Sequence, residues 1–481
     1  MLLFPSLLAC PGDDTGKAPA YLDSGAVDTS LPVDSGDTAA TGSGGPLDLA
    51  ALVVNGEASS AAGFGVAFAP GARGADDAWV TAYFTSRVCR FEGQSGVAEI
   101  GDAPLCLTAT GSGEYMGASI ATSGNLVVLG AVGGREAGAY AGKAYLFDVS
   151  GRSGEVSRDD AVAIVYAEAA GDYLGNAAAF VGDPHGDGQD DLLVGAPSND
   201  GYGAGAGKAY LFSAGLAAEQ SAGEATTSFY GSSSTSAVRH GAPEAGDGVG
   251  SVVNAAGDVN ADGLPDLVLG CNGADDGGAD AGLAAVFLGP APAGDVAIRD
   301  ADILYLGNAE PLYAGDFADA LGDSNGDGYG ELLVSGDVSV AGKVWIFPGP
   351  GASGSVDAAS TSFAGEATDD QAGASLAGAG DVDGDGTPDI VIGAYGADSA
   401  GLDAGVAYVY LAPFPEGALS LATAQQRWTG LVEGDGAGRA VEGGGDYDGD
   451  GLADLLVGAP YADVGGLAFS GQAYLILGVR R

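Results

Sequence analysis

The chain has 481 residues, with 65 acidic and 16 basic side chains, so its formal net charge is -49 at pH 7. This charge excludes a nucleic-acid-binding role, which requires a basic surface, and it disfavours contact with anionic lipid headgroups. The apolar fraction of 46% is ordinary, so a core can still be buried, and cations are the natural partners of the surface.

The first ten residues have the pattern of an exported lipoprotein. Residues 1–9 are mostly apolar and end in Leu7-Leu8-Ala9, which Cys10 follows. This segment resembles the signal peptide and lipobox of bacterial lipoproteins, in which the cysteine is acylated and becomes the mature N-terminus. The resemblance implies lipidation of Cys10 and an extracytoplasmic location, lipid-anchored at the outer membrane or the cell surface. No Lys or Arg precedes the apolar stretch, so a cytosolic N-terminus with a chance cysteine is the alternative.

Residues 11–46 form a linker between this leader and the folded part. They are mostly Asp, Ser, Thr, Gly and Pro, so they cannot bury enough apolar surface to offset the entropy lost on ordering. We therefore expect a flexible acidic tether, followed by one folded domain over residues 47–481. No other segment is long and apolar enough to span a bilayer, so membrane contact is expected only through the N-terminal lipid.

Cys89 and Cys106 lie in two short apolar runs, 87–91 and 104–108, which read as neighbouring strands of one hairpin. A cross-strand disulfide is expected in an oxidising compartment, and two separate buried thiols are the alternative. Cys271 stands where sister repeats have Ala, so we expect it to be a small packed residue.

An acidic loop that contains glycine recurs along the chain. Its clearest copy covers residues 381–389, and related loops begin at Asp183, Asp258, Asp323 and Asp446. The intervals between the first acids are 75, 65, 58 and 65 residues, which indicates a repeat architecture. Adaptation to a salty habitat would explain many acids, but it would not place them periodically.

Each loop is flanked by four short runs of strand-forming residues. A glycine-containing run such as 372–379 comes before the loop, and a β-rich run such as 389–392 follows it. The third runs begin with Gly and the fourth carry an aromatic or branched residue, as in 207–212, 342–347, 405–410 and 471–476 for the third, and 227–231, 303–307, 361–365 and 427–430 for the fourth. Four strands per period of about 60 residues are typical of a propeller blade.

Two further copies, 63–91 and 117–147, lack the acidic loop and bring the number of repeats to seven. The last copy stops after its third strand, at 471–478, whereas residues 52–57 read like a fourth strand. We therefore predict an all-β, seven-bladed β-propeller with four-stranded blades, whose ring is closed by the N-terminal strand. Closure removes the exposed sheet edges that an open array would leave.

These repeats resemble the FG-GAP repeats of integrin α-chains, which are also found in bacterial surface proteins. Gly-Ala-Pro is present at 195–197 and 458–460, and Phe64-Gly65 keeps the other half of the motif. The resemblance covers about residues 50–478. It implies that calcium loops lie on one face of the propeller. A partner would then dock on the opposite face, which is built from the loops between strands two and three and between strands four and one.

The loop pattern is Asp-x-Asp/Asn-x-Asp-Gly-x-x-Asp. Oxygens at alternate positions converge when the chain curls, the glycine at position six permits a sharp turn, and residue seven can offer its backbone carbonyl. Carboxylate oxygens suit Ca²⁺, while the scarcity of His and Cys argues against zinc or copper. We predict three to five bound Ca²⁺ ions with a structural role.

The predicted ligands come from five loops. Three loops are complete, and they contribute Asp258, Asn260, Asp262, Leu264 and Asp266, then Asp381, Asp383, Asp385, Thr387 and Asp389, and finally Asp446, Asp448, Asp450, Leu452 and Asp454. A fourth loop ends in a longer acid and contributes Asp323, Asn325, Asp327, Tyr329 and Glu331. A fifth loop contributes Asp183, Asp187, Gln189 and Asp191. It is the weakest, because His185 stands at position three and imidazole is a poor ligand for Ca²⁺.

Catalytic chemistry has little support in the sequence. His185 lies in a loop that resembles a metal site and His240 lies in a serine-rich insertion, so no Ser-His-Asp triad is apparent. We expect a non-catalytic recognition or adhesion module with a monomeric head, binding an unknown protein or glycan. The alternatives are an enzyme at the mouth of the channel, such as a polysaccharide hydrolase or lyase, and a passive surface-matrix component.

Overall fold

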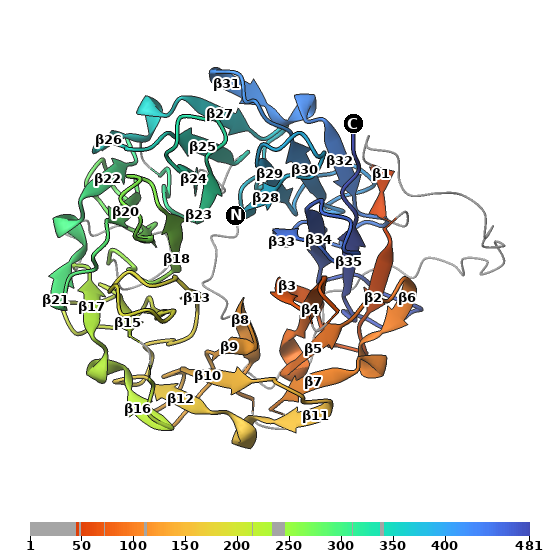
Figure 1. Cartoon of the computed structure of the whole chain (residues 1–481), viewed down its shortest axis with the longest axis horizontal. Helices are drawn as coiled ribbons and strands as arrows, with labels where there is room; N and C mark the ends of the chain where they lie inside the picture. Colours follow the sequence, from red (N-terminus) through yellow and green to blue (C-terminus); the bar gives the residue numbers. More distant parts are fainter. Residues whose placement is uncertain are drawn as a thin grey trace, which may run out of the picture.

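Seven sheets stand around a central channel in the computed structural model of the chain (Figure 1). The structure describes residues 45–47, 50–71, 73–109, 113–213, 215–232, 246–309, 311–336 and 341–481. The predicted leader with Cys10, nearly all of the predicted linker, and His240 lie outside the described residues. Within the described part, no helix combines the length and hydropathy needed to cross a membrane. The predicted all-β, seven-bladed propeller is confirmed.

Each blade is built on four antiparallel strands, which follow one another from the channel to the rim. Blades 1 and 2 contain β3 (Ala62–Pro70), β4 (Asp76–Ala82), β5 (Arg87–Phe91) and β7 (Leu105–Thr108), and β8 (Met116–Ser123), β9 (Leu126–Ala131), β10 (Lys143–Asp148) and β12 (Ala163–Tyr166). Blades 3 and 4 contain β13 (Ala178–Phe180), β14 (Leu192–Ala196), β15 (Lys208–Phe212) and β17 (Thr227–Tyr230), and β18 (Val252–Gly257), β19 (Asp266–Cys271), β20 (Leu283–Phe287) and β22 (Ile303–Leu306). Blades 5 and 6 contain β23 (Ala318–Gly322), β24 (Glu331–Gly336), β25 (Lys343–Phe347) and β27 (Thr361–Ala364), and β28 (Ser375–Gly380), β29 (Asp389–Ala394), β30 (Val406–Tyr410) and β32 (Gln426–Thr429). Blade 7 contains β33 (Ala440–Gly445), β34 (Asp454–Ala459), β35 (Gln472–Ile476) and β2 (Leu52–Asn55).

A fifth strand, which the sequence analysis missed, completes the rim of every blade. It comes from the chain segment that leads into the next blade's outer strand, and it pairs parallel with the outer strand before it. In chain order these rim strands are β1 (Gly45–Pro46), β6 (Gly96–Glu99), β11 (Gly154–Ser157), β16 (Glu219–Ser221), β21 (Gly294–Ala297), β26 (Gly354–Ser355) and β31 (Gly417–Ser420). The last six lead into single 3₁₀ turns, η3 (Ile100–Asp102), η4 (Arg158–Asp160), η5 (Ala222–Glu224), η6 (Ile298–Asp300), η7 (Val356–Ala358) and η8 (Leu421–Thr423), while η2 (Tyr83–Thr85) follows β4. Each blade is thus linked to the one before it by a rim strand.

Blade 7 is assembled from both ends of the described chain. Its outer strand β2 pairs antiparallel with β35, with Val54 opposite Ala473. β1 reaches one blade further and pairs parallel with β32 of blade 6, as Figure 1 shows near the C-terminus. The predicted closure of the ring by the N-terminal strand is therefore confirmed, and it involves two blades.

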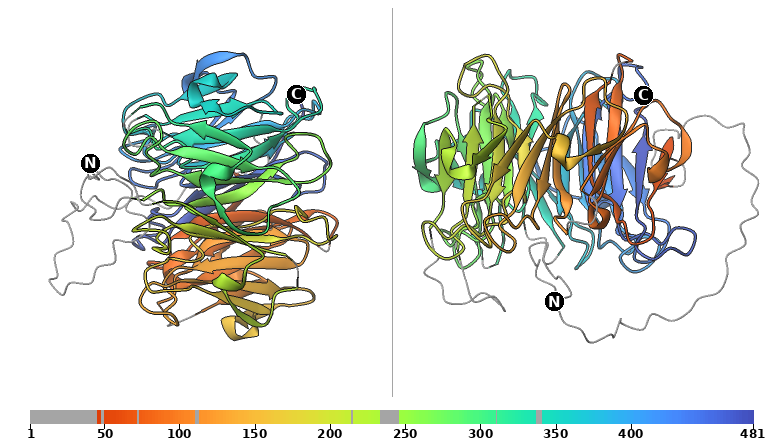
Figure 2. Two further views of the ribbon diagram at one scale, coloured as in Figure 1. Left: turned by 90° about the vertical axis from the view of Figure 1, so that its left-hand side faces the viewer. Right: turned by 90° about the horizontal axis from the view of Figure 1, so that it is seen from below.

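The apolar core is divided into seven clusters, each shared by two neighbouring blades. Second strands are covered on both faces, and β19 and β29 are buried at every residue. Glycines permit this packing: a Cβ atom on Gly195 would lie 2.0 Å from the carbonyl oxygen of Gly250 in the next blade. The glycine of Gly-Ala-Pro is therefore a packing residue. Seen from the side, the blades form a thick disc (Figure 2).

Acidic residues that follow outer strands also tie neighbouring blades together. Glu366, after the outer strand of blade 5, accepts a hydrogen bond from the Tyr408 hydroxyl (2.6 Å) and pairs with Arg427 (2.7 Å), both in blade 6. The same contact joins blades 2 and 3, where Tyr210 donates to Glu168 at 2.7 Å. These contacts fix one blade against the next and hold the connections that follow the outer strands in place.

Candidate metal-binding loops

The five predicted loops connect the innermost strand to the second strand in blades 3 to 7. We call them the acidic loops, and they cover residues 183–191, 258–266, 323–331, 381–389 and 446–454. Because neighbouring strands run in opposite directions, all five loops lie on one face of the disc. The loops between strands two and three, and those leading from the outer strand into the next blade, lie on the other face.

The first aspartate of each acidic loop organises the turn by accepting backbone hydrogen bonds. Asp381 accepts them from the N–H groups of Gly384 (2.7 Å), Asp385 (3.0 Å) and Gly386 (2.8 Å). Gly386 has a φ of 89°, a left-handed conformation that suits glycine. Equivalent bonds from positions five and six recur at Asp183, Asp258, Asp323 and Asp446. The loop backbone thus adopts the curl that lets alternate side chains face one point.

The residue at position seven also contributes to this curl. The N–H of Thr387 donates to the carboxylate of Asp385 at 2.8 Å. The same bond is made by the residues at position seven of the other loops, Gln189, Leu264, Tyr329 and Leu452. These five residues were predicted to offer carbonyl oxygens, and the structure places them next to the acid at position five.

The acid at position nine is buried in all five loops, and in those of blades 4, 6 and 7 it is held by backbone groups from two segments. Asp389 is 1% exposed and accepts hydrogen bonds from the N–H groups of Val382 (3.0 Å) and Ala412 (2.8 Å). Burial raises the pKa of Asp389 to about 7, and the neighbouring carboxylates of Asp383 and Asp385 contribute to this rise. Burial likewise raises the pKa of Asp454 to about 7. A negative charge at this position is unfavourable unless a cation lies close by.

Three acidic loops bring three acidic side chains together, with candidate ligand atoms within 4.8 Å of one another. These groups are Asp323, Asp327 and Glu331, then Asp381, Asp383 and Asp385, and finally Asp446, Asp448 and Asp454. In the loop at 258–266, the amide of Asn260 instead donates to Asp262 at 2.9 Å. Asp266 of this loop is fully buried and accepts hydrogen bonds from Val259 and Gly289, both at 2.8 Å.

The loop at 183–191 is arranged differently. His185 Nδ1 lies 2.5 Å from Asp191 Oδ2, so the imidazole contacts the buried acid at position nine. Asp191 is fully buried, and both its Oδ1 and the Nε2 of His185 are buried without a hydrogen-bond partner. Burial raises the pKa of Asp191, while the hydrogen bond with His185 lowers it. In this blade an imidazole stands where a third-position ligand would stand.

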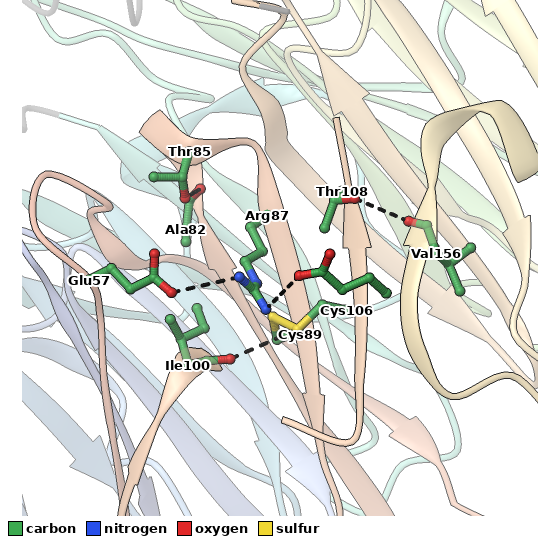
Figure 3. The surroundings of a disulfide bond; sticks show 10 residues. Glu57, Ala82, Thr85, Arg87, Cys89, Ile100, Cys106, Thr108 and Val156 are labelled. Carbon is green, nitrogen blue, oxygen red and sulfur yellow. Dashed lines mark hydrogen bonds and ion pairs between the residues drawn. A yellow bond between two sulfur atoms is a disulfide. The ribbon is translucent and has the colours of Figure 1, made fainter. Parts of the chain in front are cut away.

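A disulfide joins Cys89 on β5 to Cys106 on β7, which lie directly opposite each other (Figure 3). Close by, Arg87 pairs with Glu57 at 3.6 Å and with Glu155 at 3.1 Å. Cys271 is a buried free thiol on β19. The disulfide therefore joins the third and outer strands of blade 1, which has no acidic loop.

Carboxyl groups that were not predicted from the sequence line the central channel, a cavity of about 910 Å³. Asn254, Asp319 and Glu442 border it, each three residues before the last glycine of its inner strand. Asn254 donates to Asp319 at 2.7 Å, and the N–H of Gly378 donates to it at 3.1 Å. Burial raises the pKa of Asp319 to about 7 and that of Glu442 to about 8. Their shared repeat position was a signal that could have located them.

Comparisons with known proteins agree with this architecture. The family model described as FG-GAP repeat matches residues 372–410 and 437–476, which hold the first three strands and the acidic loops of blades 6 and 7. Integrin alpha-IIb of Mus musculus is 38% identical over 149 residues, or 29% of this chain. That match covers 14% of the length of the integrin chain.

Two solved structures also show similarity to this chain. The WD40 domain of coronin from Toxoplasma gondii has a TM-score of 0.39 and 12% identity, and the match covers 74% of this chain and 70% of that one. The Dos1 propeller has a TM-score of 0.37 and 12% identity, covering 85% of this chain and 76% of that one.

Proposed function

We propose that this chain, a seven-bladed propeller with FG-GAP repeats in blades 6 and 7, is a calcium-stabilised recognition module that works outside the cytoplasm. One observation carries the calcium part: three loops on one face each gather three acidic side chains within 4.8 Å. Carboxylates at such separations repel one another, and a divalent cation turns this repulsion into attraction.

The side chains present fit calcium better than a transition metal. The gathered groups offer only carboxylate oxygens, which are the hard ligands that Ca²⁺ takes in flexible sets of six to eight. The loops at 381–389 and 446–454 have an acid at every position where the pattern takes a side-chain ligand, and the loop at 323–331 offers two Asp, one Asn and one Glu. When bound, calcium would supply positive charge and fix the loops. We therefore propose these three sites first, the loop at 258–266 fourth, and the loop at 183–191 last.

Recognition outside the cytoplasm is supported by three features. Part of the chain is similar to an integrin α chain, a Cys89–Cys106 disulfide is typical of oxidising compartments, and the leader resembles a lipoprotein signal. We propose lipidation at Cys10, a tether over residues 11–46 and a monomeric propeller head over 47–481. The partner is proposed to be a protein or a glycan that docks on the face opposite the acidic loops.

A calcium titration of the full chain tests the metal part. We expect bound ions by elemental analysis, a lower melting temperature in chelator, and one ion fewer in Asp448→Ala. Each lost site should cost roughly 2.7 kcal/mol when free calcium is about 100 times the Kd. The control is Asp300→Ala, which removes an exposed acid outside the loops. An unchanged melting temperature in chelator, with no ion bound at micromolar calcium, would refute the proposal.

An enzyme is the second candidate, because the channel holds carboxyl groups with raised pKa values at Asp319 and Glu442. A carboxyl group that keeps its proton near neutral pH is what a general acid for glycoside cleavage requires. Incubation with a panel of polysaccharides tests this reading. Product release that is lost in Glu442→Gln would favour the enzyme, and absence of product from every polysaccharide would leave the binding module.

A further inference from the structure

Large apolar side chains gather on one sector of the face opposite the acidic loops. Eight large hydrophobic side chains are exposed among the described residues, and five of them lie in loops of blades 6, 7 and 1. These five are Phe84 (50% exposed), Leu402 (59%), Val432 (61%), Leu467 (47%) and Phe469 (55%). Exposed apolar side chains that cluster mark interaction sites, whereas scattered ones need no explanation.

The loops that carry these side chains form one continuous surface, which we call the apolar–acidic patch. It comprises residues 56–62, 82–86, 395–405, 430–438 and 459–471. The N–H of Gly434 donates to the carbonyl oxygen of Leu402 at 2.9 Å, and the N–H of Ala61 donates to that of Phe469 at 3.0 Å. Backbone hydrogen bonds join 430–438 to 459–471 and 56–62 to 82–86 in the same way. The patch therefore crosses three blades without a break in the chain of contacts.

The charged side chains within the patch are all acidic, while Arg87 and Arg439 lie at its edges, against Glu57 and the Tyr395 ring. Its five loops contain no Lys and no Arg, while Asp398, Asp403, Glu433 and Asp463 are exposed within them. Asp463 accepts a hydrogen bond from the backbone N–H of Phe469 at 2.7 Å, so an exposed acid and a residue with an exposed ring belong to the same turn. A surface with this pattern repels acidic partners and is complementary to apolar surfaces flanked by positive charge.

We propose that the apolar–acidic patch docks a protein or peptide partner that presents apolar side chains flanked by Lys and Arg. This inference rests on the proposed recognition function and adds the sector of the face and the chemistry of the partner. The apolar side chains would be desolvated at the centre of the contact, and the acids would pair with cations at its edge. A second copy of the chain is a poor occupant, because both surfaces would be acidic.

Calorimetry with a peptide of alternating Leu and Lys tests the proposal on the full chain with calcium present. We expect binding at physiological salt, and about tenfold weaker binding in the triple variant Leu402→Ser, Val432→Ser and Phe469→Ser. The matched control is Val97→Ser with Val162→Ser, because these side chains are 70% and 44% exposed but lie at the rim. The control should bind the peptide as the unmodified chain does.

A second peptide, with Ser in place of every Leu, separates docking from plain charge attraction. Equal binding of the two peptides, or equal loss in the triple variant and the rim control, overturns the proposal. Concentration-dependent self-association that requires Leu402, Val432 and Phe469 would assign the patch to a second copy and also overturns it. None of these results depends on the number of calcium ions, so failure of the docking proposal is distinguishable from failure of the metal sites.

Discussion

Glu442 borders the central channel, and burial together with the charge of Asp319 raises its pKa to about 8. A carboxyl group whose pKa is higher in the folded chain than in the unfolded chain binds an extra proton on folding. The contribution of Glu442 to the free energy of unfolding therefore falls as the pH rises from about 5 to about 8. Since the channel leaves the side chain partly exposed, the cost is moderated by water.

We predict that Glu442→Gln stabilises the propeller at pH 8 by about 1–2 kcal/mol and that this gain disappears below pH 5. Thermal melting across this pH range, with calcium in excess, measures the difference. Glu416→Gln, at an exposed acid on the rim, is the control and should show no such trend. A gain of equal size at pH 5 and pH 8 would contradict the assignment of the charge to Glu442.

The position of each acid in its loop was predictable from spacing, but the hydrogen-bond partners of these acids were not. The pattern places Asp389 at position nine, and the structure adds that Ala412, 23 residues later, donates to it. The contact between His185 and Asp191 is similar, because it depends on how the loop folds over its own buried end. Spacing along the chain predicts which side chains converge, whereas donors from other connections become visible only in the fold.

The acidic loop of blade 3 offers a direct test of whether the residue at position three decides calcium binding. In it the imidazole of His185 contacts Asp191, so the third ligand position is filled by a poor calcium ligand. We predict that His185→Asp restores the pattern and adds one bound calcium ion, measured by elemental analysis or calorimetry. His185→Ala is the matched control, since it removes the imidazole without supplying an oxygen. An unchanged ion count in His185→Asp would show that the third position does not decide occupancy.

Strands were predicted well where side chains alternate or are buried on both faces. The second strand of blade 6 was expected to begin at 389, and β29 covers Asp389–Ala394 with every residue buried. The rim strands were not predicted because they lack a strand pattern: β31 (Gly417–Ser420), for example, has no buried residue and no apolar alternation. Such a strand is held by backbone pairing with the neighbouring blade and by one partly buried side chain, Leu419 in β31, which is too little for a recognisable pattern in a single sequence.

Ring closure makes blade 7 unlike the other six blades. Its outer strand β2 reaches β35 without a connecting loop, and Leu52 is 1% exposed in the core between blades 7 and 1. This arrangement was predictable, because the last repeat lacks a fourth strand and the first ordered residues supply one. The overlap of β1 with blade 6 was not, since two residues are too few for a pattern.

We predict that Leu52→Ala speeds unfolding more than Ile303→Ala, which removes a buried side chain from the outer strand of blade 4. Both variants should lose about 2–5 kcal/mol of packing. Leu52→Ala weakens strand β2, which no hairpin connects to its partner β35, whereas Ile303 lies in a strand that follows its partner in the chain. The stability lost in Leu52→Ala should therefore appear mainly as faster unfolding. Proteolysis at a protease concentration where cleavage outpaces refolding measures the unfolding rate of each variant, and equal rates would argue against ring closure as the weak point.

The pairing of β1 with blade 6 and of β2 with blade 7 affects how the chain resists a pulling force. A pulling force applied at the N-terminus reaches two hydrogen-bonded ladders on adjacent blades in succession, β1 with β32 and then β2 with β35. Each strand pairing alone is short, with two residue pairs between β1 and β32 and four between β2 and β35. Together they anchor residues 45–55 across a blade boundary, so tension applied from the N-terminal side is borne by two blades before the ring can open.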